Sequence, residues 1–189
     1  MKYDFIGDIH GHAQLLERIL LRLGYQSECN SYVASDGERK VIFLGDYIDR
    51  GPQNRKVIEI VRSMTETGQA IALMGNHEFN AIYYHTCSSS GYDYLRQQSV
   101  KNKTQHKSFN IEYEIDSAEL EETISWFQSL PIWWEDSDVR AIHACWHEPA
   151  REFLLDNWLA DPQGQIITDN WEVFVKEQDS DAPMNPFRA

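Results

Sequence analysis

The strongest constraint on the fold is a repeated order of segments: a short apolar run, a polar block that contains glycine, and a stretch with helical spacing. The apolar runs are residues 3–6, 41–44 and 70–74. The first helical stretch stops at Gly24, and the second is opened by Pro52 and followed by Gly68. Short apolar strands that alternate with helices favour an α/β domain built on a parallel sheet.

The later part of the chain gives weaker patterns. The third run is followed by a short helix that ends near residue 84, and residues 86–109 are polar and predict an irregular insertion near the site entrance. Residues 117–130 have helical spacing with Ser117 as the N-cap, and residues 139–143 predict a strand. Beyond residue 149 we expect helices near 150–155 and 170–176 and a loose end.

Four polar blocks follow the predicted strands, and they carry most of the chemistry. The blocks are Gly7-Asp8-Ile9-His10-Gly11, Gly45-Asp46-Tyr47-Ile48-Asp49-Arg50-Gly51, Gly75-Asn76-His77-Glu78 and Ala141-Ile142-His143-Ala144. A single Gly-Asp or Gly-Asn pair is an ordinary turn signal. In an open α/β sheet, however, sites form beyond the carboxyl ends of the strands. Four blocks in order, each after an apolar run, therefore predict one shared site.

The residue types in these blocks predict a pair of divalent cations that assist phosphoester hydrolysis. Two cations about 3.5 to 4 Å apart clamp the ester oxygens and lower the pKa of a shared water. Asp46 is the candidate bridge, because a carboxylate has two oxygens and offsets the repulsion between cations. Asp8 and His10 can serve one metal, and Asn76 and His143 the other. Mixed carboxylate, amide and imidazole ligands suit Mn, with Fe or Zn as alternatives.

Three further residues complete the predicted chemistry. Arg50 offers a planar fork that matches two phosphate oxygens, and Asn76 is a second candidate for substrate binding. His77 follows a predicted ligand directly and is the candidate general acid. Asp49 is its orienting partner, since a carboxylate that bonds one ring nitrogen aims the imidazole and keeps it protonated.

The blocks resemble those of the calcineurin-like metallophosphoesterases, in particular the phosphoprotein phosphatase branch with its GDxHG, GDxxDRG and GNHE blocks and a later histidine. The resemblance runs over residues 2–149 and is greatest to bacterial members over 126–148. It implies an α/β/β/α sandwich with two divalent metals. It also implies specific roles: Asp8, His10 and Asp46 at the first metal, Asp46, Asn76 and His143 at the second, Arg50 on phosphate, and His77 with Asp49 as the acid.

One departure from the family pattern concerns the end of the chain. The family supplies another late histidine to the second metal, in a Gly-His block that residues 144–189 lack. We therefore expect one domain over residues 1–189 whose sandwich is incomplete at the C-terminal end, either as a fragment or closed by pairing along a sheet edge. We also expect weak binding of the second metal. His147 is the alternative ligand, whereas His12 and His106 are expected to face solvent.

Composition limits the partners. The formal net charge is -13, from 30 acidic and 17 basic residues, and such a field repels a nucleic-acid backbone. No apolar run approaches the roughly 20 residues that cross a bilayer, and the first block begins too early to leave room for a signal peptide. We expect a soluble cytoplasmic protein without nucleic-acid or membrane partners. Its oligomeric state stays open.

Three functions fit these observations. The leading hypothesis is a phosphoric monoester hydrolase acting on phosphoserine and phosphothreonine in proteins or on small phosphate esters, because Asp49, Arg50 and the pair His77-Glu78 occur together. The alternative is a dinucleoside polyphosphate hydrolase of the diadenosine tetraphosphatase type on the same scaffold. The third is an inactive module that binds metal or phosphate, which the incomplete second metal site favours.

Overall fold

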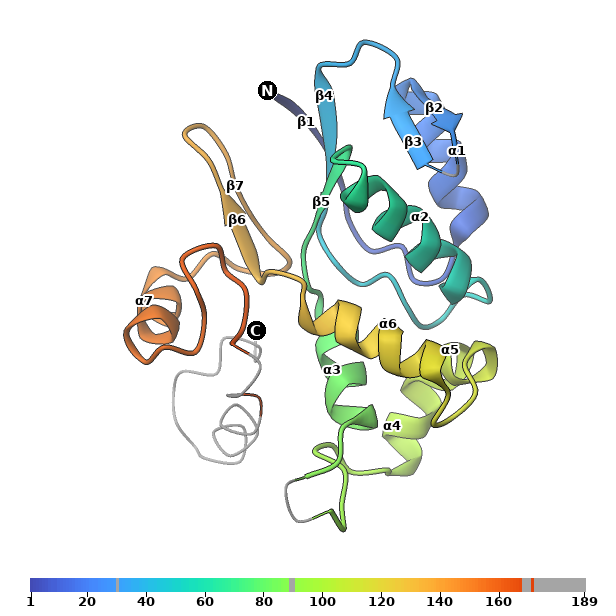
Figure 1. Ribbon diagram of the computed structural model, residues 1–189, viewed down its shortest axis with the longest axis vertical. Helices are drawn as coiled ribbons and strands as arrows, with labels where there is room; N and C mark the ends of the chain where they lie inside the picture. The colour runs from blue at the N-terminus through green and yellow to red at the C-terminus, as the bar shows by residue number, and fades with distance from the viewer. Residues whose placement is uncertain (30, 89–90, 168–170, 172–189) are drawn as a thin grey trace.

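The centre of the molecule is a three-stranded parallel sheet. The computed structural model describes residues 1–29, 31–88, 91–167 and 171 (Figure 1). Strands β1 (Lys2–Ile6), β4 (Arg39–Phe43) and β5 (Ala70–Ala72) lie in the order β1-β4-β5. Ile6 pairs with Phe43, and Phe43 pairs with Ala72. The three carboxyl ends therefore lie at one edge, which confirms the predicted α/β class.

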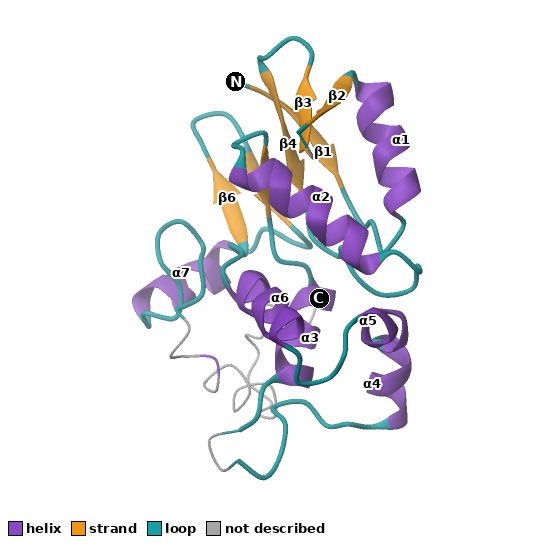
Figure 2. Ribbon diagram, turned by 45° about the vertical axis from the view of Figure 1, so that its right-hand side comes forward, coloured by secondary structure: helices purple, strands orange, loops and turns teal. Residues whose placement is uncertain are grey.

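Helices α1 (Ala13–Leu23) and α2 (Asn54–Glu66) cover one side of this sheet (Figure 2). Their apolar faces join the main core, and α1 ends at Gly24, which takes a left-handed φ of 90° as a helix stop requires. Between them lies a hairpin, β2 (Tyr25–Glu28) with β3 (Ser31–Ala34), which the sequence analysis missed. Its first strand is mostly polar and exposed, so apolar spacing gave no signal for it.

Helices α3 (Asn76–His85), α4 (Val100–Gln105), α5 (Lys107–Glu112) and α6 (Ala118–Gln128) form the part below the sheet in Figure 1. Ser117 caps α6 as predicted, its hydroxyl accepting from the Leu120 backbone at 3.2 Å. The expectation of an irregular insertion over residues 86–109 is wrong in its second half, which holds α4 and the start of α5. Helix α4 buries none of its side chains, so it has no apolar face to reveal it.

The last described elements lie on the other side of the sheet from α1 and α2. Strands β6 (Trp133–Glu135) and β7 (Arg140–Ile142) form an antiparallel hairpin, and α7 (Glu148–Asp156) follows. Trp133 is buried, and Trp134 packs edge-on against Tyr3 with ring centroids 5.1 Å apart. Within the residues that can be described, β6 and β7 form a two-stranded sheet that is separate from the parallel sheet.

The helix expected near residues 170–176 lies outside the described residues, apart from residue 171. Among the described helices, none has the length and apolar character needed to cross a membrane.

Candidate active site

Three of the four polar blocks meet at the carboxyl edge of the sheet through backbone contacts. The amides of Ile9 and His10 donate to the Asp46 carbonyl at 3.0 and 2.9 Å, and the amide of Gly51 donates to the His10 carbonyl at 2.8 Å. The first and second blocks are thus joined into one loop layer. The third block adjoins it through Gly75, where a Cβ atom would lie 2.3 Å from the Asp46 backbone nitrogen. Only glycine permits that approach.

Four non-glycine residues of these loops have a left-handed backbone. The φ angles are 48° at His10, 57° at Asp46, 72° at Asp49 and 66° at Arg50. Such values are uncommon outside glycine and persist only where surrounding structure enforces them. Their concentration in two adjacent loops marks this edge of the sheet as the functional site.

Glu78 is the side chain that holds the Asp46 loop. It is fully buried, and its carboxylate accepts from the backbone amides of Asp46 and Tyr47 at 2.8 Å each and of Gly75 at 3.0 Å. Burial and the negative charge of Asp46 raise the pKa of Glu78 to about 7, while the N–H donors favour its carboxylate form. The sequence analysis gave Glu78 no structural role, because its contacts with the amides of Asp46 and Tyr47 span about 30 positions in the chain.

The structure brings the five predicted metal ligands together around the Asp46 carboxylate. His10 Nε2 lies 3.7 Å from Asp46 Oδ2 and 3.6 Å from Asp8 Oδ2. His143 Nε2 lies 3.5 Å from Asp46 Oδ1 and 3.0 Å from Asn76 Oδ1. These ligands come from the ends of β1, β4 and β7 and from the start of α3. Asp46 is the member that faces both imidazoles.

Hydrogen bonds at the far side of two imidazoles prepare them to bind cations. His10 Nδ1 donates to the Ile48 carbonyl at 2.9 Å, and His143 Nδ1 donates to the Leu44 carbonyl at 2.8 Å. Since a carbonyl only accepts, each Nδ1 carries a proton, and in the neutral ring Nε2 is left as the atom with a lone pair. Nε2 of His10 faces the carboxylates of Asp8 and Asp46, and Nε2 of His143 faces the side-chain oxygens of Asp46 and Asn76. His10 Nε2 is buried and has no hydrogen-bond partner within the described structure. These donors therefore fit divalent cations.

Two overlapping groups have ligand atoms close enough to share an ion. One is His10, Asp46 and His77, and the other is Asp8, Asp46 and His143, with all ligand atoms of a group within 4.8 Å of one another. Asp46 belongs to both groups, as a bridging ligand would. Asp8, which is exposed, lies within reach of His143 as well as of His10.

His77 and Asp49 form a short contact beside the ligands. His77 Nδ1 lies 2.6 Å from Asp49 Oδ2, and the Asp49 side chain is completely buried. Burial disfavours the charged form of each group, but hydrogen bonds and nearby opposite charges outweigh this effect on both pKa values. Contacts with His106 and His77 hold the pKa of Asp49 below its usual value, and the hydrogen bond that Asp49 accepts from His77, with the charge of Asp46, raises the pKa of His77. His77 therefore keeps its proton to higher pH than a free imidazole does.

The expectation that His106 faces solvent is wrong. The side chain is completely buried, and its Nδ1 atom lies 2.9 Å from the Asp49 oxygen that His77 contacts. His106 stands in a polar segment, and only the folding of α4 and α5 against α3 reveals its burial. His12 is exposed as expected, and His147 caps α7 through the amide of Ala150 rather than joining the ligands.

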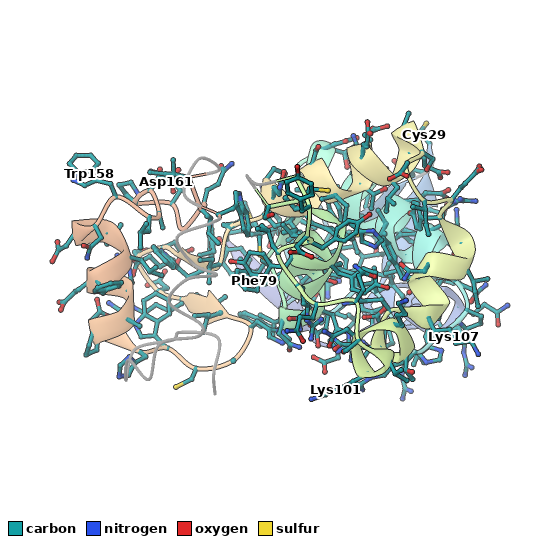
Figure 3. All side chains as sticks on the ribbon, turned by 90° about the horizontal axis from the view of Figure 1, so that it is seen from below. Cys29, Phe79, Lys101, Lys107, Trp158 and Asp161 are labelled. Atoms are coloured by element: carbon teal, nitrogen blue, oxygen red, sulfur yellow. The ribbon has the colours of Figure 1, made fainter. Side chains whose placement is uncertain are left out.

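A cleft of about 670 Å³ lies beside this cluster. Arg50, Asn76 and His77 line one wall, and residues of α3, α4 and α5 with their junction complete it: Asn80, Thr104, Gln105, Lys107, Ser108 and Ile111. Figure 3 shows Lys101 and Lys107 at this end of the molecule, and Trp158 and Asp161 at the opposite end beyond Phe79. The polar segment that the sequence placed at the site entrance does line the cleft.

Comparison with known proteins shows the family to which the chain belongs. The sequence profile described as calcineurin-like phosphoesterase matches residues 1–172. The chain belongs to this family. This confirms the resemblance noted in the sequence, and membership of this family implies a site for divalent metal ions. The identity of the metal does not follow from the family.

Several curated relatives carry one name, bis(5'-nucleosyl)-tetraphosphatase PrpE [asymmetrical]. The protein of Oceanobacillus iheyensis is 42% identical over 83 residues, which cover 44% of this chain and 32% of that protein. The protein of Halalkalibacterium halodurans is 40% identical over 83 residues, covering 44% and 33%. The matched part of the chain thus spans about a third of the length of these relatives.

A solved structure supports the fold alone. A mutant of a cold-active protein tyrosine phosphatase superposes with a TM-score of 0.53 and 20% sequence identity, covering 82% of this chain and 47% of that one. At this identity the likeness concerns the arrangement of helices and strands.

Proposed function

We propose that this protein hydrolyses the phosphoanhydride bond of dinucleoside polyphosphates, the alternative among the sequence hypotheses. The observation that carries the proposal is the cleft beside the ligand cluster. Its volume of about 670 Å³ lies in the range of small-molecule sites and exceeds what one phosphoryl group needs. Arg50 and Lys107 both line it and offer cations to successive phosphates. The name of the curated relatives supports the same substrate class.

The proposed metal assignment uses the ligands described above. Asp8, His10 and Asp46 hold the first cation, and Asp46, Asn76 and His143 hold the second, with Mn²⁺ as the proposed ion and Fe or Zn as alternatives. When bound, the cations neutralise phosphate charge and activate the attacking water. The second set has one carboxylate and one histidine. All seven histidines of the chain lie at described positions, and His147, the other candidate ligand, caps α7. We therefore propose the second site as the weaker one.

The proposed steps for the protein side chains follow from their positions. Arg50 bonds two oxygens of the phosphoryl group, and Asn76 contacts the substrate from the same wall. The water oxygen forms a bond to phosphorus while the bond to the leaving oxygen breaks. His77 gives the proton on Nε2 to that oxygen, and Asp49 aims the ring through Nδ1. The attacking water loses one proton to solvent, and His77 regains a proton from solvent after the products leave.

His77 also belongs to one of the two groups that could share an ion, so it could act either as a metal ligand or as the general acid. Its Nε2 atom lies 3.9 Å from Asp46 Oδ2. The same nitrogen cannot hold a proton and bind a cation. The short contact with Asp49, which raises the pKa of His77, favours the protonated ring and hence the acid.

A second candidate function is hydrolysis of small phosphoric monoesters, and the contact between Asp49 and His77 favours it. A terminal phosphate has a second pKa near 6, so a nucleotide leaving group depends less on the proton from His77 than an alcohol does. The oxygen of an alkyl alcohol is far more basic and needs the proton. A protein that aims a protonated histidine this closely is equipped for alcohol leaving groups as well.

A panel of three substrates with added Mn²⁺ separates these functions. The probes are diadenosine tetraphosphate, p-nitrophenyl phosphate and a phosphoserine peptide, with nucleotide products resolved by chromatography. We expect ATP and AMP in equal amounts from the first probe. Turnover of p-nitrophenyl phosphate alone would replace the proposal with the second candidate, and no turnover of any probe would leave a binding module.

Variants make the panel specific to the proposed site. Asp46→Asn should remove activity, because an amide cannot balance two cations as a carboxylate does. The matched control is Asp138→Asn, an exposed residue of the β6–β7 turn, which should keep wild-type activity. Equal losses in both variants would show that the activity depends on surface charge rather than on the cluster.

A further inference from the structure

His106 lies at the junction of α4 and α5 and contacts two charged groups. Its Nδ1 atom is 2.9 Å from Asp49 Oδ2, and its Nε2 atom is 3.0 Å from Arg96 Nη1. Tyr84 lies beside the ring, with centroids 5.1 Å apart. His106 has no exposed surface, so this polar side chain is enclosed between a carboxylate and a guanidinium.

The contact with Arg96 determines which ring nitrogen of His106 carries the proton. A guanidinium only donates and stays charged in proteins, so Nε2 of His106 must accept. A neutral imidazole has one acceptor and one donor, and the proton therefore sits on Nδ1. That proton faces Asp49, although the N–H direction deviates from the line between the two atoms. Arg96 thus directs the Nδ1 proton of His106 toward the Asp49 carboxylate, 2.9 Å away.

Arg96 is itself tied to the cleft wall. Its Nη2 atom donates to Gln105 Oε1 at 3.1 Å, and its backbone amide donates to the Tyr83 carbonyl at 3.0 Å. Gln105 precedes His106 and lines the cleft. One continuous set of contacts therefore runs from the α4 wall of the cleft through Arg96, His106 and Asp49 to His77.

Asp49 depends on this set for its orientation. Its Oδ2 atom lies 2.6 Å from His77 Nδ1 and 2.9 Å from His106 Nδ1. Its Oδ1 atom is buried without a hydrogen-bond partner within the described structure. Its backbone amide donates to Asn54 Oδ1 at 2.7 Å, which fixes the main chain but not the carboxylate. Because His106 Nδ1 and His77 Nδ1 both contact Oδ2, rotation of the carboxylate away from His77 would also break its contact with His106.

We propose that His106, held by Arg96, is a positioning residue that aims the His77 acid through Asp49. The proposal rests on the acid role of His77 in the proposed function. It assigns a purpose to the polar segment over residues 96–106, which otherwise adds a buried histidine and a partly buried arginine at a cost in desolvation. Loss of His106 should then resemble a milder loss of His77.

Leaving-group dependence distinguishes aiming of the acid from a structural role. Turnover of an alkyl phosphate and of p-nitrophenyl phosphate is measured for the Mn²⁺-loaded wild type, His77→Gln, His106→Leu and His106→Asn. General acid catalysis contributes about 10²- to 10⁴-fold, so His106→Leu should lose at least about tenfold on the alkyl ester and much less on the aryl ester. His106→Asn restores an N–H donor near Nδ1 and should recover most of that loss.

Matched controls and unfolding curves accompany the kinetics. His147→Asn keeps the α7 cap with a good capping residue and should match the wild type on both esters. Thermal unfolding must show that each variant is folded at the assay temperature. Equal losses of His106→Leu on both esters, or no recovery in His106→Asn, would overturn the proposal.

Nuclear magnetic resonance of the metal-free protein tests the aiming without turnover. Long-range ¹H–¹⁵N spectra should show His106 as the neutral ring protonated at Nδ1, and His106→Leu should shift or broaden the His77 Nδ1 proton. An Nε2-protonated or cationic His106, or an unchanged His77 signal, would overturn the proposal. If His77→Gln shows no preference between esters, the acid role fails, and the spectra alone decide whether His106 orients the pair.

Discussion

Replacing Glu78 with glutamine should loosen the loop that carries Asp46. The amide keeps the size of the side chain but exchanges one acceptor for a donor. One carboxylate oxygen accepts from the amides of Asp46 and Gly75, at 2.8 and 3.0 Å, and the other from Tyr47 and Ile48, at 2.8 and 3.4 Å. Whichever oxygen is replaced, at least one short, buried backbone N–H loses its acceptor.

The magnitude follows from these contacts. A hydrogen bond to a charged group contributes about 1.5 to 3 kcal/mol, and the replaced oxygen serves two donors, of which one is long in the Tyr47 case. We expect Glu78→Gln to lower the free energy of unfolding by about 3 to 5 kcal/mol. For a chain of this size that corresponds to a fall of roughly 10 °C in Tm. Metal affinity should fall too, since the positive φ of Asp46 would no longer be held.

Thermal unfolding of the metal-free protein by circular dichroism is the assay. The matched control is Glu59→Gln on the exposed side of α2, whose only described partner is Lys56 at 3.2 Å. Exposed pairs of this kind contribute at most about 1 kcal/mol, so the control should stay close to the wild type. A Glu78→Gln protein with wild-type Tm would refute the view that this carboxylate holds the Asp46 loop.

Two further predictions concern packing and acid stability. Gly75→Ala places a Cβ atom 2.3 Å from the Asp46 nitrogen, so it should lower the free energy of urea unfolding by at least about 2 kcal/mol. The control, Gly7→Ala, places a Cβ atom with nothing within 4 Å and should leave that free energy nearly unchanged. Equal effects of the two variants would contradict the close approach at Gly75. Burial lowers the pKa of His85 to about 4, so the unfolded chain binds the proton first as pH falls from 6.5 toward 4. Stability should therefore be complete above about pH 6.5 and fall across that window, and His85→Asn should flatten the slope of unfolding free energy against pH; an unchanged slope would exclude His85 as its source.

Much of the site could be predicted because its signals are local. Apolar runs before Asp8, Asp46 and Asn76 specify buried strands, and the glycines beside them specify tight loops, so parallel pairing brings the loops to one edge. Ser117 was found for the same reason, since a cap acts within its own helix turn. His143 followed from a short strand at the right place in the order of blocks.

The residues that the sequence did not reveal make their contacts with residues far away in the chain. The position of Glu78 three residues after Gly75 is a local sign of a capping glutamate, but its contacts with the amides of Asp46 and Tyr47 in another block have no local sign. His106 is enclosed only after α4 and α5 pack, and neither helix shows apolar periodicity. The hairpin of β2 and β3 is likewise stabilised by contact with α1 and α2 rather than by its own composition.

The claim that Asp46 bridges two cations is tested most directly by electron paramagnetic resonance during a titration with Mn²⁺. The wild type should first show the signal of an isolated ion and then, at excess Mn²⁺, the multiline signal of a spin-coupled pair, because the second ligand set is weaker. Asp46→Asn should never develop the coupled signal, whereas Asp138→Asn should match the wild type. Two uncoupled ions in the wild type, or a coupled pair that survives in Asp46→Asn, would contradict the bridging role of Asp46.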